Sequence, residues 1–366
     1  MKFTCSRSDL NNAVKNVQRA VATKSTNPSL EGILLKAHND CLNLTGYDLE
    51  IGINTDVEVQ IDSEGEVVVS AKLFGDIIKK LPEELVTVET DKRLVTHITS
   101  GRAEYQVVGI NSSDFPDLPK FEETDKVVIN GGLLKDMIRQ TIYAVSDNSP
   151  KPIYTGSLFE IKDKVLTIAS TDGYRLAVRK ETINSSSDNS FVIPKKTLGE
   201  VLKLITDDED DVEIVIGQRH TLFKVGSFYV ISRLLEGQFI DYNSAIPKET
   251  RTTAIVNTKE IGSSVERMNL LSNDKVPSPV RCVFNDNTVK LTCKTSMGRA
   301  NDVISTKISG EKVEIGFNSK YLLEGIKNSE TEEVKLTLNG AIAPMIISPV
   351  EGDSFIHLVL PMRLKD

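Results

Sequence analysis

The sequence predicts an α+β protein of three similar domains in tandem, on three observations. One amphipathic segment occurs three times: VSAKLFGDIIKKL over 69–81, IPKKTLGEVLKLI over 193–205 and FNSKYLLEGIKN over 317–328. The interval of about 124 residues is the length of an ordinary domain and far exceeds that of a solenoid repeat. The 366 residues are also more than a single hydrophobic core usually supports.

Each third of the chain carries the same order of predicted elements. A short strand and a helix come first, followed by two alternating strands joined by a turn, the recurring helix, and a further group of strands. We therefore expect two helices packed on about eight short antiparallel strands in each domain. The chain turns polar after 114–119 and after 245–247, which predicts domains at 1–122, 123–249 and 250–366.

The composition is typical of a globular protein and indicates no membrane segment. Hydrophobic residues make up 39% and charged residues 26% of the chain, and no apolar run reaches the length of a membrane span. The amino terminus lacks the apolar region of a secretion signal. We expect a cytoplasmic protein whose dispersed cysteines stay reduced. These are Cys5, Cys41, Cys282 and Cys293.

No group of residues indicates catalysis. The four histidines are dispersed without metal-ligand spacing, and neither a nucleophile elbow nor a phosphate-binding loop occurs. We expect no metal and no cofactor. One enzymatic alternative stays open, a hydrolase acting through Asp172 and Arg175, although an Asp-Gly pair in a hairpin turn is typically structural. A secreted adhesin of repeated β-rich domains is a third alternative.

The recurring helix presents one charged face in each copy. At about 100° per residue, Lys72, Asp76 and Lys79 fall together, opposite the apolar residues, and the other copies repeat this pattern with Glu200 and Glu324 as the acids. A basic surface of this kind inside a protein of net charge −8 favours contact with phosphates, without sequence preference. The predicted cations are Lys15, Arg19, Lys24, Lys72, Lys79, Arg139, Lys151, Lys195, Lys196, Lys203, Arg267, Lys320 and Lys327.

Three like domains also suggest closure with a second chain. A domain of this size has a diameter of roughly 35 Å, so three in a triangle leave almost no hole, whereas six leave one of roughly 35 Å. Such a hole admits a nucleic-acid duplex with water around it. Head-to-tail contacts between two chains would close the ring.

Several motifs resemble one known family across the whole chain. The bacterial DNA polymerase III beta subunits, the sliding clamps, are similar in six stretches: MKFTCSRSDL at the start, TGYDLEIG over 45–52, SSDFPDLP over 112–119, STDGYRLAV over 170–178, EIGFNSKYLLE over 314–324 and LVLPMRL over 358–364. The resemblance implies the DNA clamp fold, a ring-shaped head-to-tail dimer, double-stranded DNA through its centre and a processivity role without catalysis. The implied partners are the polymerase III alpha subunit, the clamp loader and other proteins with a clamp-binding motif.

The resemblance further implies a partner-peptide pocket on the second and third domains. By matching positions it comprises Tyr154, Thr171, Gly173, Tyr174, Arg175, Leu176, Ile240, Asn318, Tyr321, Ile342, Pro344, Val359, Leu360, Pro361, Met362 and Arg363. Ile240 stands where the family often has proline. Lys365 and Asp366 extend beyond the usual carboxyl end.

The implied dimer contact joins the first domain of one copy to the third domain of the other. On the first domain it comprises Arg102, Tyr105 and Val107, which we expect on a strand. On the third domain it comprises Leu270 and Leu271, at the end of a helix. Tyr105 and the two leucines are suited to serve as apolar anchors. Packing in the core of their own domain is the alternative.

Overall fold

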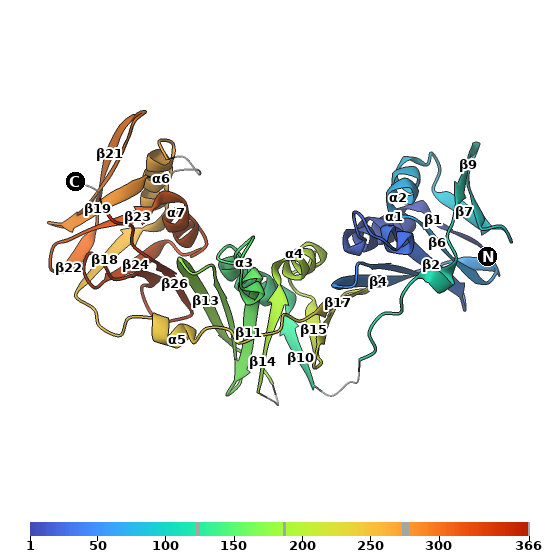
Figure 1. Ribbon diagram of the computed structural model, residues 1–366, viewed down its shortest axis with the longest axis horizontal. Helices are drawn as coiled ribbons and strands as arrows, with labels where there is room; N and C mark the ends of the chain where they lie inside the picture. The colour runs from blue at the N-terminus through green and yellow to red at the C-terminus, as the bar shows by residue number, and fades with distance from the viewer. Residues whose placement is uncertain (122–124, 186–187, 273–277, 365–366) are drawn as a thin grey trace. The chain divides into compact units, whose positions relative to one another are not determined.

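A computed structural model of the chain describes residues 1–121, 125–185, 188–272 and 278–364 (Figure 1). Its contacts divide the chain into two units. The first unit comprises Met1–Leu134 with Lys196–Leu234, and the second comprises Lys135–Lys195 with Leu235–Asp366. The predicted domain boundary at 122/123 and the Lys365–Asp366 extension lie outside the described residues. Among the helices described, none is long and apolar enough to cross a membrane.

The first unit contains two antiparallel sheets. A five-stranded sheet has the order β5-β1-β7-β8-β9, and an eight-stranded sheet the order β10-β15-β16-β17-β4-β3-β2-β6. The strands are β1 Lys2–Ser6, β2 Gly32–His38, β3 Cys41–Tyr47, β4 Ile51–Glu58, β5 Gln60–Ser63, β6 Gly65–Ser70, β7 Leu85–Thr90, β8 Val95–Ser100, β9 Ala103–Val108, β10 Asp125–Asn130, β15 Asp211–Ile216, β16 His220–Val225 and β17 Phe228–Arg233. Helices α1 (Arg7–Val17) and α2 (Ala71–Lys80) pack on each other and on these strands.

The second unit has a nine-stranded sheet, β14-β11-β12-β13-β26-β25-β24-β18-β22, and a four-stranded sheet, β21-β20-β19-β23. The strands are β11 Gly156–Lys162, β12 Val165–Thr171, β13 Arg175–Thr182, β14 Asn189–Pro194, β18 Thr252–Asn257, β19 Pro279–Asn285, β20 Thr288–Thr295, β21 Gly298–Ser305, β22 Lys307–Gly310, β23 Val313–Asn318, β24 Glu333–Leu338, β25 Met345–Pro349 and β26 Phe355–Val359. Helices α6 (Thr258–Asn269) and α7 (Ser319–Lys327) pack on both sheets.

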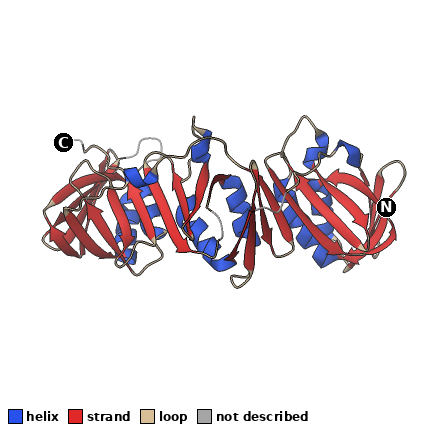
Figure 2. Ribbon diagram, turned by 90° about the horizontal axis from the view of Figure 1, so that it is seen from below, coloured by secondary structure: helices blue, strands red, loops and turns tan. Residues whose placement is uncertain are grey.

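The remaining helices are α3 (Gly131–Ile142), α4 (Lys195–Leu204) and the short α5 (Tyr242–Ala245). Single 3₁₀ turns occur at η1 Gln18–Ala20, η2 Pro28–Glu31, η3 Ser112–Asp114 and η4 Pro152–Thr155. Figure 2 shows the helices against the antiparallel strands. The predicted α+β class with this element order in each third is confirmed.

The strand-to-helix turns are capped by equivalent residues. The Ser6 side chain accepts a hydrogen bond from the backbone N–H of Asp9, and Asn130 accepts one from that of Leu133. Asn257 accepts from the backbone N–H groups of Lys259 and Glu260. A polar side chain at this place satisfies a backbone donor that the helix cannot pair internally. These caps define Ser6, Asn130 and Asn257 as matching positions of the three repeats.

Three rows of residues, each beginning three positions before one of these caps, cross the sheets through matched strands. The rows are Phe3–Val88–Ile98–Tyr105, Val127–Ile214–Phe223–Val230 and Ala254–Leu336–Ile347–His357. Each row lies on the core face of its sheet, because every residue in the three rows except Tyr105 is buried. Tyr105, Val230 and His357 are therefore structural equivalents.

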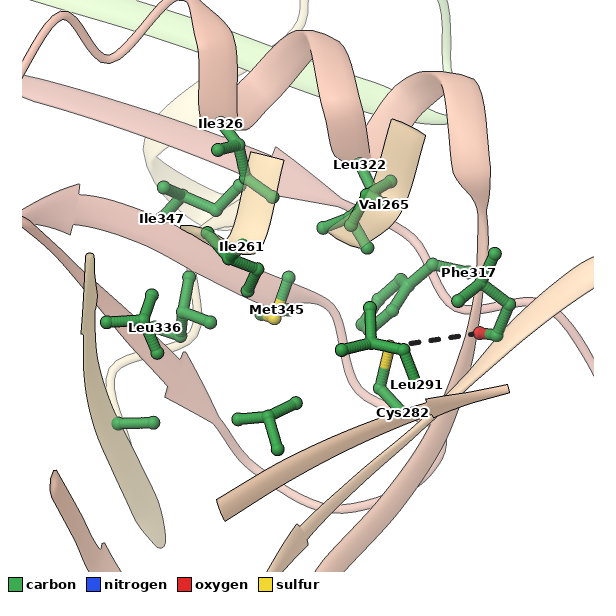
Figure 3. Close-up of a cluster of buried hydrophobic side chains, with 14 of the residues drawn as sticks. Ile261, Val265, Cys282, Leu291, Phe317, Leu322, Ile326, Leu336, Met345 and Ile347 are labelled. Atoms are coloured by element: carbon green, nitrogen blue, oxygen red, sulfur yellow. Dashed lines mark hydrogen bonds between the residues drawn. The ribbon is translucent and has the colours of Figure 1, made fainter. Parts of the chain in front are cut away.

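The third-domain core shows what the helices cover. Figure 3 shows Ile261 and Val265 of α6 and Leu322 and Ile326 of α7 pointing toward the strands. Phe317 of β23 is wholly buried among them. Burying a side chain of this kind contributes about 2 kcal/mol, so this core fixes α7 and its charged face relative to both sheets.

The recurring helix has the predicted orientation in its first copy. Phe74, Ile77 and Ile78 are buried, whereas Lys72 and Lys79 are exposed. The apolar face packs on the sheets and the lysines face solvent, so this prediction is confirmed for α2.

His357 ends its row as a wholly buried ionisable group. Its Nδ1 lies 2.8 Å from the carbonyl oxygen of Gly325, and its ring packs on Tyr143 and Phe355, at 5.5 Å and 5.0 Å between ring centroids. Burial lowers the pKa of His357 to about 4, because the charged ring would lose its hydration.

Replacing His357 with valine, the residue at the equivalent position 230, should remove a pH-dependent loss of stability. Unfolded chain takes up a proton near pH 6.5, whereas the folded protein resists protonation until about pH 4. Stability of the unmodified protein should therefore fall as pH decreases through this interval, by up to about 3 kcal/mol. Urea unfolding followed by circular dichroism at several pH values measures this, and an equal loss in His357→Val would contradict it.

Candidate functional sites

The turn between β12 and β13 organises one candidate site in the second unit. Asp172 accepts bonds from the backbone N–H groups of Tyr174 (2.9 Å) and Arg175 (3.1 Å), and Thr171 Oγ1 donates to the carbonyl of Arg175 (2.7 Å). Gly173 has φ of +90°, a conformation that L side chains rarely adopt. The turn thus fixes Tyr174 outward, 63% exposed, and Arg175 inward, 8% exposed.

Arg175 connects this turn to α7. Its Nε donates to Asp172 Oδ2 at 3.0 Å, its Nη1 pairs with Glu324, and its guanidinium lies 4.5 Å from the ring centroid of Tyr321. The Tyr321 ring also stacks on Tyr174, with 6.3 Å between centroids. Tyr174, Tyr321 and Arg175 thus form an aromatic and cationic rim. The planar guanidinium of Arg175 contacts two carboxylates and one aromatic ring at the same time.

Beside this rim lies an apolar group that we call the pocket cluster. Its buried members are Ile153, Leu158, Ala169, Leu176, Val178, Val192, Tyr242 and Leu358, and its partly buried members are Tyr154, Leu235, Phe239, Ile240, Ile246 and Ile356. Tyr154 meets Phe239 edge to face, with 6.2 Å between centroids. Partly exposed aromatic and branched side chains over a buried floor are typical of a peptide-binding surface.

Three of the predicted pocket residues, Tyr154, Leu176 and Ile240, belong to the pocket cluster. Sequence reasoning missed Phe239 and Tyr242, although the run GQFIDY over 237–242 carries apolar residues. Val359 lies instead in the third-domain core, and Leu358 points to the pocket cluster. The alternation of a strand explains this shift, because neighbouring residues face opposite sides of the sheet.

The carboxyl-terminal tail is attached to both sides of this site. Leu360 N–H donates to the carbonyl of Tyr174 at 2.9 Å, and Met362 N–H donates to that of Gly316 at 2.8 Å. Pro361 and Met362 are half-buried, and Arg363 is exposed. The tail therefore borders the β12–β13 turn without covering it.

Other predicted pocket residues lie on α7 and on the loop between β24 and β25. Asn318 caps α7 by accepting from the backbone N–H of Lys320 at 2.9 Å. Pro344 is half-buried, and Ile342 is 92% exposed. An isoleucine this exposed is available to a bound partner.

The predicted cations divide into three groups. Lys15, Lys24, Lys72, Lys79, Arg139 and Lys320 are exposed and form no ion pair within the described residues. Lys151 lies 5.7 Å from the ring centroid of Tyr154. The others are ion-paired: Arg19 with Glu200, Lys195 with Asp147, Lys196 with Asp48, Lys203 with Glu200, Arg267 with Asp302 and Lys327 with Glu266.

These pairs correct the expectation that all three helix acids face solvent beside their lysines. Asp76 is exposed, but only 12% of the Glu200 side chain and 31% of that of Glu324 is exposed. Glu200 Oε2 lies 3.8 Å from Arg19 Nη1, and Glu324 forms an ion pair with Arg175. Both acids contact the preceding repeat, which a helical projection of one segment cannot show.

The predicted dimer residues lie on or beside strands that end their sheets in the described part of the chain. Strands β9 and β21 are the edges of the five-stranded and four-stranded sheets. Tyr105 on β9 is 40% exposed, Val107 is buried and Arg102 is exposed. Leu270, after α6, is 81% exposed, whereas Leu271 packs against the third-domain core.

The hydrolase alternative has no support. Both carboxylate oxygens of Asp172 are engaged by the turn and by Arg175. Within the described residues, no cluster of three or more histidine, cysteine or acidic residues is arranged to hold a metal. Asp172 and Arg175 thus build the turn.

Three tandem domains, each with two helices on antiparallel sheets, define the class of DNA clamps. Family models for the N-terminal, central and C-terminal domains of the DNA polymerase III beta subunit match residues 1–119, 128–241 and 243–363. The chain belongs to the DNA polymerase III beta subunit family, the beta sliding clamps, which are non-catalytic.

Individual relatives match over their full length. Beta sliding clamps of Bacillus subtilis (strain 168) and Halalkalibacterium halodurans are each 34% identical, with 99% of this chain and 100% of the relative covered. The crystal structure of the sliding clamp from Bacillus subtilis has a TM-score of 0.97 at 33% identity, with 100% of both chains covered. The beta subunit from Streptococcus pyogenes has 0.95 at 28%, with the same coverage.

Replacing Arg175 with methionine should destabilise the second unit by about 3 kcal/mol, because Asp172 and Glu324 would lose their shared cation in a largely buried place. Chemical unfolding measures this loss. The matched change Glu324→Gln keeps a hydrogen-bond acceptor at a position one third exposed and should cost no more than about 1 kcal/mol. Equal, small losses in both variants would contradict a central role of Arg175.

Proposed function

We propose that the chain acts as a DNA sliding clamp: two copies close head to tail around duplex DNA and tether the replicative polymerase. Membership of the beta sliding clamp family supports this role. The proposal includes the domain boundaries 1–122, 123–249 and 250–366 and a cytoplasmic location.

The observation that carries the closure is a pair of incomplete sheets. The nine-stranded sheet joins five strands of one repeat to four strands of another through β26 and β13. The five-stranded sheet ends at β9 and the four-stranded sheet at β21. Together they would reproduce the nine-stranded order, and an unpaired strand edge is a template for pairing with another chain. A second copy of this chain supplies both missing halves.

Equivalent positions support the dimer residues. Tyr143 lies thirteen positions after the helix cap Asn130, and Leu270 lies thirteen positions after the helix cap Asn257, so the two residues are equivalent. His357 and Tyr105 are also equivalent, because they end matching rows. Within the second unit the Tyr143 and His357 rings touch. The corresponding contact between two copies brings Leu270 against Tyr105 of the partner subunit, and it buries these two exposed side chains. Leu271 of the first copy and the partner's Val107 lie beside this contact.

The cations would contact DNA phosphates. We propose that the unpaired residues Lys72, Lys79, Arg139 and Lys320 provide most of this contact, because paired cations already have a carboxylate partner. Lysine and arginine contacts of this kind are electrostatic and independent of base sequence. A clamp that slides requires such contacts.

The pocket cluster and its rim would bind short motifs of partner proteins. Its partly exposed apolar side chains suit apolar anchors, and Tyr174, Tyr321 and Arg175 suit aromatic or acidic neighbours of those anchors. The proposed partners are the DNA polymerase III alpha subunit, the clamp loader and other proteins with a clamp-binding motif.

Charge reversal of Lys72, Lys79, Arg139 and Lys320 to glutamate should reduce loading onto nicked circular DNA at least about tenfold, because each lost phosphate contact weakens electrostatic attraction. Retention after gel filtration, with a clamp loader present, measures this. The unmodified protein should stay on circles and run off linear DNA.

The matched control reverses four exposed lysines away from the helices: Lys92, Lys248, Lys294 and Lys312. This control variant has the same net charge as the helix variant. If only the helix variant loses retention on circular DNA, the loss is due to the helix positions. Equal retention of the unmodified protein on circular and linear DNA would contradict encirclement.

Tyr174→Ala should weaken binding of a polymerase-derived motif peptide about tenfold, because it removes an exposed ring of the rim. Deletion of Pro361–Asp366 should abolish it. Fluorescence polarisation with a labelled peptide measures both, and Tyr229→Ala, a partly exposed tyrosine of the first unit, is the control. Unchanged affinity in both variants would place the site elsewhere.

A further inference from the structure

Two charged residues lie on strands that end their sheets. Arg299 on β21 and Glu104 on β9 are both exposed. Neither forms an ion pair within the part of the chain that the structure describes. Each lies on the solvent face of its sheet: Arg299 is opposite exposed Lys294, and Glu104 is opposite exposed Thr99. An inference about them rests on the proposed dimer.

The faces of the two edge strands limit how they can pair. On β21, Ala300, Asp302 and Ile304 are opposite the wholly buried Cys293, Leu291 and Val289. On β9, Tyr105 and Val107 are opposite the buried Ile98 and Thr96. A continuous sheet must join core face to core face. A slip of one residue would reverse every side chain, so only alternate registers remain.

Internal equivalence selects one of these registers. Three further rows begin four positions before α2, α4 and α7: Val67–Leu35–Leu44–Thr55, Phe191–Phe159–Ile168–Arg179 and Ile315–Cys282–Leu291–Asp302. Thr55 is opposite Phe228, and Arg179 is opposite Phe355. The matching residue of β9 is Ala103, two positions before Tyr105. Asp302 therefore falls opposite Ala103 of the partner subunit.

This register brings the unpaired charges together. Ala300 falls opposite Tyr105 of the partner subunit, Asn301 opposite the partner's Glu104, and Arg299 opposite the partner's Gln106. We propose that Arg299 forms an ion pair with Glu104 of the partner subunit, diagonally across the β21–β9 junction on its solvent face. Diagonal neighbours on one face of an antiparallel pair lie about 7–8 Å apart, within reach of arginine and glutamate.

The corresponding positions inside the chain carry two apolar residues. Leu176 occupies the position of Arg299, and Ile356 that of Glu104. Both belong to the pocket cluster. At these two positions the proposed dimer junction has two opposite charges in place of the two apolar residues. The pair favours β9 of a second copy over other strand edges, because a like charge or an apolar residue there would leave Arg299 without an ion-pair partner.

A charge swap tests the pairing on the full chain. Arg299→Glu alone places two carboxylates together, and Glu104→Arg alone places two guanidinium groups together. Because both junctions of a closed dimer change, each single variant should raise the dimer dissociation constant about a hundredfold, about tenfold per junction. The double variant should return to within about threefold of the unmodified protein. Sedimentation equilibrium over a dilution series measures all three.

Matched controls place the same new charges on exposed residues of the central repeat, away from the proposed junction. Lys162→Glu and Glu209→Arg should leave the dissociation constant unchanged. A dimer that is indifferent to both single reversals, or a double variant weaker than either single one, would overturn the ion pair while leaving the ring intact. An unmodified protein that is monomeric at every concentration would overturn the proposed ring, and the pair with it.

Discussion

The architecture depends on the backbone hydrogen bonds of strand edges. A strand at the end of a sheet leaves a row of N–H and C=O groups without partners, and each requires either water or another strand. This chain satisfies four such edges internally at two junctions, where β4 pairs with β17 and β13 pairs with β26. Each of these sheets is built from halves of successive repeats, so neighbouring domains are joined by main-chain bonds as well as by side-chain contacts.

The same backbone position carries different chemistry at each junction. On the outer face, Gly52 and Asn54 correspond to Leu176 and Val178. Asn54 borders a groove of about 420 Å³ whose lining includes Lys36, Asn43 and Glu66, whereas Leu176 and Val178 floor the apolar pocket cluster. The main chain can therefore repeat without repeating the binding site. Side chains at two or three outward positions decide whether a junction presents an apolar or a polar surface.

Much of this organisation could be predicted from the sequence. The repeat interval and the lysine-led helices predicted three domains and their element order, because amphipathic periodicity is a local property. The pairing of Glu200 with Arg19 and of Glu324 with Arg175 could not be predicted, because each joins segments that are distant in the sequence. The same applies to Leu358 and Val359, since the face of a strand depends on its register with neighbours. Phe239 and Tyr242 lie in a segment without periodicity, so no local signal assigned them to the pocket cluster.

The cations differ in whether an acid of the preceding repeat holds them. Lys196 pairs with Asp48 and Arg19 with Glu200, and each pair joins a helix to the preceding repeat. Such cations are held in place by fixed acids, which makes them suited to position domains and less suited to contact phosphates. Lys72 and Lys320 occupy matching helix positions and form no ion pair within the residues that the structure describes. A sliding protein must exchange phosphate contacts without a deep energy minimum, and a few flexible, solvated lysines meet this requirement better than a dense basic surface. The overall negative charge is consistent with this arrangement, because it limits nonspecific attraction to DNA away from those few positions.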